Sequence, residues 1–164
     1  MEQEQVYTQP RRHDGMPAEI VRALDGDNLE ARLGEAIRLA TVTPDGWPHA
    51  AELTVGEILS LGPHNLLAAI WPESHTTANL RRSGRVTLSL VSDYAIFEIR
   101  GQARLIAERQ TPLGLAVFRI RVEQVQEHRS AYADVMSGLN FRLHNPQRTL
   151  ARWREQIEAL KKLA

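Results

Sequence analysis

The stretch that decides the fold runs from residue 74 to residue 86 and reads SHTTANLRRSGRV. Ser74 is a favoured N-cap residue, and Arg81 and Arg82 would place positive charge in the last helical turn, where it suits the helix dipole. Gly84 fits the position just past a helix, because glycine adopts the left-handed conformation without a steric penalty. The stretch therefore predicts one short helix that leads directly into a strand.

Alternating apolar residues after this helix predict half-buried β-strands. The period of two is clear over 86–90 and 95–107, and a third alternating segment covers 117–125. Gly101 falls in the apolar phase of the second segment, which indicates a bulge or a close approach to the backbone. Three strands are therefore expected after the helix.

Three further strands are predicted before it. Residues 36–42 alternate up to a Pro-Asp-Gly turn, which predicts a β-hairpin with a second arm over 47–55. A third strand covers 66–71, and residues 58–61 could extend the sheet. Because an open antiparallel sheet of six strands leaves edges that aggregate, closure into a barrel is the natural solution. We predict a mainly β fold, a six-stranded antiparallel barrel with a short mid-chain helix.

The two ends of the chain differ from the barrel. Residues 1–16 are rich in Gln, Glu and Arg and offer little to bury, so we expect a mobile N-terminal arm. Asn145 and Pro146 can open an amphipathic C-terminal helix, whose apolar residues fall at spacings of three and four. A length of 164 residues suits one domain. We expect that domain to cover 17–164.

Composition excludes several classes of function. The chain has 20 basic and 20 acidic residues, so no global field attracts nucleic acid or an anionic membrane surface. It has no cysteine, which excludes disulfides, thiolate metal sites and cysteine nucleophiles. The polar N-terminal residues do not resemble a signal peptide, and the longest apolar run, 66–71, is far too short to span a membrane. We expect a cytoplasmic protein without nucleic-acid or membrane partners.

The common catalytic and metal-binding motifs are missing. The sequence contains no G-x-S-x-G elbow, H-E-x-x-H helix, P-loop or G-x-G-x-x-G turn. Asp25 and Asp27 resemble the start of a calcium loop, but Ala36 stands where the closing glutamate belongs. The six histidines lack the i, i+3 or i, i+4 spacing of a helical metal site. We therefore predict no metal site, and no catalytic residue is identified.

The start of the mid-chain helix is the candidate binding site. Helix N-termini gather unpaired amide groups and partial positive charge, which suits an anion such as a phosphate. Ser74, Thr76 and Thr77 would add hydroxyl groups there, and His75 would add a ring nitrogen. A plain cap with a polar first turn is the alternative, and the residues by themselves leave both open.

Three segments together resemble the pyridoxamine-phosphate-oxidase-like, FMN-binding split barrels. Residues 38–49, RLATVTPDGWPH, are similar to that family's opening strand and turn. Residues 74–86 are similar to its S-R-K-x-x-N-L helix, and residues 99–104, IRGQAR, to a later strand. The order and spacing of these three segments agree with those of the family over residues 36–107. The resemblance implies a split-barrel homodimer that binds FMN in a groove between subunits, with the phosphate near the mid-chain helix.

The resemblance also implies which residues bind the cofactor. Ser74 and Thr77 keep groups that can bind phosphate, whereas His75 and Thr76 stand where the family has an Arg-Lys pair. Losing two cations removes charge-assisted contacts, which are stronger than neutral hydrogen bonds. The first strand would contribute an arginine to the phosphate, and a tryptophan would stack on the flavin. The implied residues are Arg38, Trp71, Ser74, His75, Thr76, Thr77 and Asn79.

Three functions remain open on such a barrel. One is an FMN-dependent oxidoreductase acting on a small molecule, in which the flavin carries the redox chemistry. The second function is that of a non-catalytic sensor or carrier, which binds haem, the deazaflavin F420 or another phosphate-bearing ligand. The missing Arg-Lys pair favours this function. A dimeric barrel that serves only in protein contacts is the third.

Overall fold

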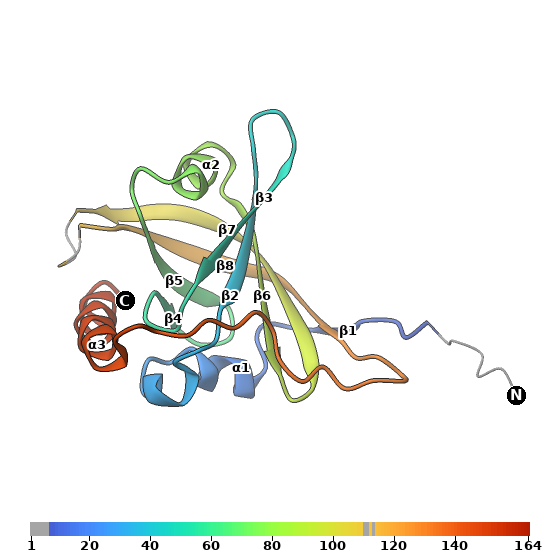
Figure 1. Cartoon of the computed structure of the whole chain (residues 1–164). Coiled ribbons are helices and arrows are strands. Elements are labelled where there is room, and N and C mark those ends of the chain that lie inside the picture. Colours follow the sequence, from blue (N-terminus) through green and yellow to red (C-terminus); the bar gives the residue numbers. More distant parts are fainter. Residues whose placement is uncertain (1–6, 110–111, 113) are drawn as a thin grey trace, which may run out of the picture.

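The computed structural model describes residues 7–109, 112 and 114–164. One curled antiparallel sheet forms the body of the molecule (Figure 1). Its strands are β1 (Arg11–His13), β2 (Ile37–Val42), β3 (Pro48–Leu53), β4 (Ile58–Ser60), β5 (Asn65–Ile70), β6 (Arg85–Ser92), β7 (Ala95–Glu108) and β8 (Ala116–His128). They lie in the order β3-β2-β6-β7-β8-β5-β4, and β1 pairs with β8 beyond the end of β5.

Alternating side chains explain why the sheet curls around one core. In β6 and β7 the inward residues Leu88, Phe97 and Ile99 are fully buried, while their neighbours face outward. The long strands β7 and β8 pair over most of their length, with a register shift at Gly101. A Cβ atom at Gly101 would lie 2.6 Å from the carbonyl oxygen of Arg121, so the bulge requires glycine.

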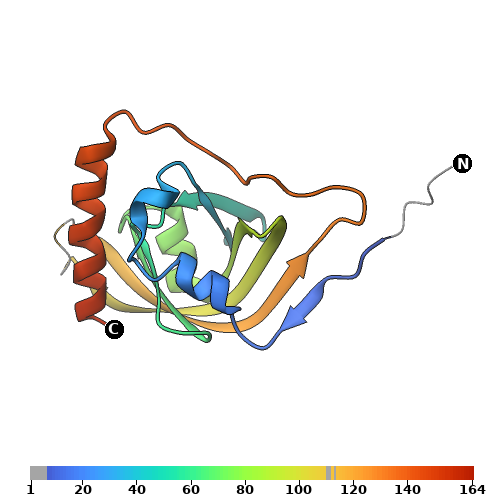
Figure 2. The same ribbon diagram turned by 90° about the horizontal axis from the view of Figure 1, so that it is seen from below.

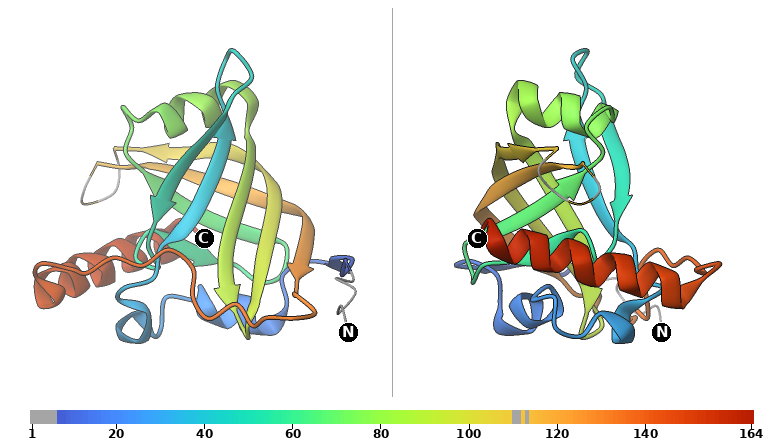
Figure 3. Two further views of the ribbon diagram at one scale, coloured as in Figure 1. Left: turned by 45° about the vertical axis from the view of Figure 1, so that its right-hand side comes forward. Right: turned by 90° about the vertical axis from the view of Figure 1, so that its left-hand side faces the viewer.

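Helices close the two ends of the barrel. α2 (His75–Ser83) lies at one end, while α1 (Ala18–Ala23) and the 3-10 helix η1 (Leu29–Arg32) lie at the other (Figure 1). α3 (Pro146–Lys162) runs along the outside near β4 and η1 (Figure 2). The tip of the β2–β3 hairpin stands at the same end as α2 (Figure 3).

The predicted class is confirmed: the chain is a mainly β split barrel with a short mid-chain helix and a C-terminal amphipathic helix. The strand count needs correction, since the described residues form eight strands rather than six. β4 falls in the segment 58–61, which the sequence left as an extension. β1 falls within the predicted mobile arm, whose residues 1–6 lie outside the described residues. Its sequence, RRH, has no apolar alternation, so only its pairing with β8 makes it a strand.

Candidate functional site

Local hydrogen bonds fix the first turn of α2. The Ser74 hydroxyl oxygen accepts from the amide of Thr77 at 3.1 Å, so Ser74 is the N-cap that the sequence predicted. The Thr77 hydroxyl donates to the carbonyl oxygen of Trp71 at 2.7 Å. Helix geometry leaves the amides of His75 and Thr76 without an intrahelical acceptor. These amides and the helix dipole suit an anion.

Side chains on the inner side of α2 hold it on the barrel. Asn79 and Thr77 are 4% and 0% exposed. Asn79 Nδ2 donates to Thr41 Oγ1 in β2 at 3.0 Å. The structure therefore buries both of these predicted cofactor-binding residues, and the Asn79 side chain joins α2 to the barrel. Thr76 is also buried, whereas Ser74 is half-buried.

A second histidine joins the predicted site from the hairpin. His75 is exposed at the start of α2, and its ring centroid lies 5.9 Å from that of His49 in β3. The two residues are 26 positions apart, so no local spacing links them. Docking of α2 beside the hairpin brings them together. Imidazole N–H groups can donate to an anion, and His49 thus lies at the candidate site, where the sequence did not place it.

Two further predicted residues lie apart from each other. Trp71 directly precedes α2 and is 60% exposed, as a stacking residue must be. Arg38 lies in the half of β2 away from α2, and its guanidinium donates to Glu52 in β3 at 2.9 Å. It lines a recess of about 450 Å³ together with Ser89 and Leu139. The structure thus groups Trp71 with α2 but brings Arg38 to a different part of the sheet.

A larger groove lies on the outer face of β2, β6 and β7. Its volume is about 630 Å³, and we call it the β-face groove. The sequence indicates this groove only indirectly: the alternation in β6 and β7 places the outward side chains of each strand on one face of the sheet. The residues that define it here are Ala40, Arg85, Thr87, Arg100, Gly101 and Gln102.

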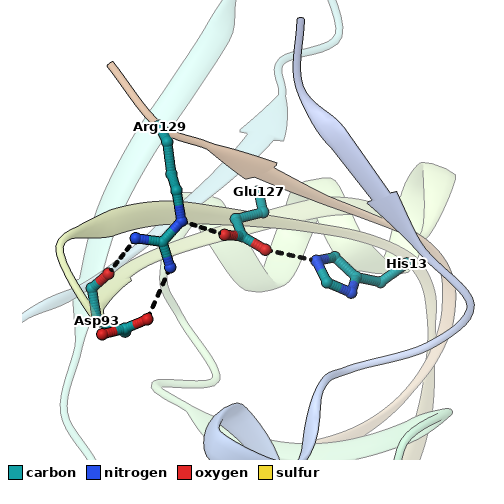
Figure 4. A network of polar contacts seen from close by, with 4 residues as sticks. All are labelled: His13, Asp93, Glu127 and Arg129. Carbon is teal, nitrogen blue, oxygen red and sulfur yellow. Dashed lines mark hydrogen bonds and ion pairs between the residues drawn. The ribbon is translucent and has the colours of Figure 1, made fainter. Parts of the chain in front are cut away.

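A network of polar contacts joins β1, β8 and the β6–β7 turn (Figure 4). Glu127, 6% exposed, contacts His13 Nε2 at 2.7 Å and accepts from Arg129 Nε at 2.5 Å. Arg129 also donates to the carboxylate of Asp93 at 2.8 Å. Burial alone would raise the pKa of Glu127, but hydrogen bonds from Arg129 and His13 and their charges outweigh it and lower that pKa. The network fastens β1 to the sheet.

The described residues also lack two further features. No helix in this part of the chain is long and apolar enough to cross a membrane. Within the same residues, no three His, Asp or Glu side chains cluster closely enough to hold a metal ion.

Comparison with known proteins gives consistent matches. Residues 31–136 match the sequence model described as pyridoxamine 5'-phosphate oxidase. The uncharacterized protein YclD of Bacillus subtilis is 33% identical over 148 residues, covering 90% of this chain and 96% of YclD.

Solved structures share the fold. A proposed pyridoxamine 5'-phosphate oxidase from Lactobacillus delbrueckii matches with a TM-score of 0.53 and 18% identity, over 72% of this chain and 98% of its own. Another from Listeria innocua has a TM-score of 0.50 and 22% identity, over 68% and 98%. A heme binding protein from Mycobacterium smegmatis has a TM-score of 0.50 and 16% identity, over 72% and 57%.

Proposed function

Because the chain belongs to the pyridoxamine 5'-phosphate oxidase-like family, we propose that it binds FMN and acts as a flavin-dependent oxidoreductase on a small molecule. The observation that carries the proposal is the first turn of α2, where Ser74 matches the family motif and two imidazoles lie beside each other. We also propose that the protein is a cytoplasmic homodimer with one domain over residues 17–164.

A phosphate group fits this first turn. The amides of His75 and Thr76 provide two donors, and the N-terminal end of the helix dipole favours negative charge. His49 and His75 supply ring N–H donors from β3 and α2. The pair compensates in part for the family's Arg-Lys pair, whose second position, Thr76, is buried here. We therefore assign the phosphate to Ser74, His75, the Thr76 amide and His49.

Trp71 is placed to stack on the flavin ring beside this phosphate site. Trp71 is exposed immediately before the helix, and its face can stack on a flat aromatic ring. When bound, FMN supplies hydride or electron transfer, so the chain itself needs no obligatory acid or base. The roles of these residues are to bind the phosphate and to orient the ring.

Exposed apolar side chains support the homodimer. Tyr132, Met136 and Leu139 are 74%, 77% and 50% exposed in the segment that follows β8. Leu139 and Ile96 line the same recess on the outer face of the sheet. Contiguous apolar surface of this kind marks an interface. Light scattering of the purified protein should give the mass of two chains, and the mass of one chain would contradict the dimer.

Titration with FMN tests the proposed function. We expect saturable quenching of flavin fluorescence and a higher melting temperature, because a ligand that binds the native state stabilises it. His49→Ala and His75→Ala should each weaken binding by about tenfold, the effect of one lost hydrogen bond to a charged group. His144→Ala is the matched control, since His144 is an exposed histidine outside this site.

A gain of affinity gives a second test. His75 is exposed, so His75→Arg restores the family's cation without burying it, and we expect tighter FMN binding. Thr76→Lys is less suitable because Thr76 is only 2% exposed. Folded protein that remains colourless, binds no FMN and gains no thermal stability would exclude the proposal.

The histidine pair also favours a second candidate, a non-catalytic haem-binding protein. Imidazole is a common axial ligand of haem iron, and either ring could serve. Hemin titration should then give a Soret shift that His49→Ala or His75→Ala removes. F420 also carries a phosphate, so competition between F420 and FMN would show that the phosphate site determines binding. Substrate-dependent bleaching of bound flavin would show that haem binding is not the whole function of the protein.

A further inference from the structure

The β-face groove lies apart from the proposed FMN phosphate site. It reaches Arg85 and Gln102, which lie beside the C-terminal end of α2, whereas the phosphate is assigned to the N-terminal end. Nine helical residues separate those ends by roughly 13 Å at 1.5 Å per residue. The groove volume of about 630 Å³ falls within the range of small-molecule sites.

The strands give the groove a flat floor. Ala40 pairs with Thr87, and Thr87 pairs with Arg100, so these three outward side chains form one row across β2, β6 and β7. Arg85 and Gln102 pair with each other in the next row. Two small residues, Ala40 and Thr87, are thus bordered by three long ones. A floor of this shape suits a flat ring rather than a bulky one.

The charges around the groove leave one cation uncompensated. The guanidinium of Arg100 is paired with Glu98 at 2.7 Å, and Glu123 is paired with Arg121 at 2.6 Å. Within the described part of the chain, the Arg85 side chain has no hydrogen bond or ion pair. An anionic group in the groove would therefore meet an available guanidinium, which binds carboxylate and phosphate in the same forked geometry.

A neutral acceptor lies next to this cation. Gln102 Nε2 donates to the carbonyl oxygen of Ser83 at 2.8 Å, at the end of α2. This contact fixes the amide and leaves its Oε1 atom to accept a hydrogen bond from a ligand. The groove thus combines a flat floor, a free cation and an oriented acceptor.

We propose that the β-face groove is a second ligand site, which binds a small flat molecule through a carboxylate or phosphate on Arg85. The site does not depend on FMN, because it uses neither the first turn of α2 nor the histidine pair. The anionic group supplies affinity through Arg85, and the ring lies over Ala40 and Thr87.

Model compounds test this proposal. The probes are 2-naphthoate, 2-naphthyl phosphate and the neutral isostere 2-naphthamide, followed by fluorescence and by chemical shifts of labelled protein. We expect one or both anions to bind about tenfold or more tightly than the amide, with shifts confined to β2, β6 and β7. Comparison of the two anions shows whether carboxylate or phosphate is preferred. Equal affinity for anion and amide would overturn the proposal.

Paired variants separate charge from shape. Arg85→Ala should abolish the preference for the anion, whereas Arg104→Ala, an exposed arginine of β7 outside the groove, should preserve it. Thr87→Leu should block the ring without changing charge, and Ser89→Leu, the next outward residue of β6, is its control. FMN affinity should stay unchanged in Arg85→Ala. The site would be refuted if the two arginine variants changed the anion preference equally, or if the chemical-shift changes fell outside β2, β6 and β7. It would also be refuted if no probe bound because a second copy of the chain covers this face.

Discussion

Asn79 in α2 donates a hydrogen bond to Thr41 in β2 at 3.0 Å, and both side chains are almost completely buried. Asn79→Ala should lower the free energy of unfolding by about 1–3 kcal/mol, because it leaves the buried Thr41 hydroxyl without its partner. Urea unfolding measures the loss. Thr41→Val removes the acceptor instead, and the double variant should cost clearly less than the two single costs added. Purely additive costs would show that the contact contributes nothing.

Ser74 combines a structural and a proposed binding role, and one substitution separates them. Ser74→Ala should destabilise the protein by about 1 kcal/mol through loss of the N-cap. Ser74→Asp should keep the cap and the stability, because aspartate is an equally good N-cap and suits the helix dipole. Its negative charge should nevertheless repel a phosphate. Thermal melts and FMN titration of both variants check this, and undiminished affinity in Ser74→Asp would locate the phosphate elsewhere.

Glu127 should make the protein less stable in acid. The pKa of this carboxyl is lowered in the folded state, since contacts with Arg129 and His13 outweigh the effect of burial. A lowered pKa contributes stability that is complete above the ordinary value of 4.5 and is lost as pH falls through the folded value. Glu127→Gln should therefore destabilise at pH 7, with a difference that shrinks below pH 4.5.

Urea unfolding across pH measures this difference. The matched control is Glu123→Gln in the same strand, an exposed ion-pair partner of Arg121, which should change stability by less than about 1 kcal/mol. A constant cost of Glu127→Gln at every pH would contradict the assigned role of the network.

Glu57 should give stability the opposite dependence on pH. Burial raises the pKa of its carboxyl, and hydrogen bonds from the amide and hydroxyl of Thr54 offset this only in part. The associated stability is present at low pH and is lost as pH rises through the folded value. Glu57→Gln should therefore gain stability at pH 7 relative to pH 4, measured by urea unfolding at both. A gain that is larger at pH 4 would refute this.

Local signals explain most of what the sequence could predict. Ser74 and Gly84 bracket α2 by their own conformational preferences, and Gly84 does adopt a left-handed φ of 68°. Alternation predicted the strands that carry apolar residues, and Gly101 lies at a bulge as expected. Each of these features depends on residues that are close in the sequence.

Features that depend on distant residues were not predictable in the same way. β1 has no apolar alternation, and His13 meets Glu127 across 114 positions. His49 and His75 become neighbours only when the hairpin and α2 stand side by side. Thr77 and Asn79 match a binding motif, yet a one-dimensional motif does not show that they face the barrel. Arg85 lies at the β-face groove and has no side-chain partner among the described residues, a combination that only the fold defines.

The contact between β1 and β8 also determines when each strand can form during synthesis. β1 leaves the ribosome 114 positions ahead of its partner. At roughly 5–20 residues per second, it waits for about six seconds or longer. β1 therefore cannot pair until β8 has been synthesised, whereas the local hairpins β2–β3 and β4–β5 can form before then.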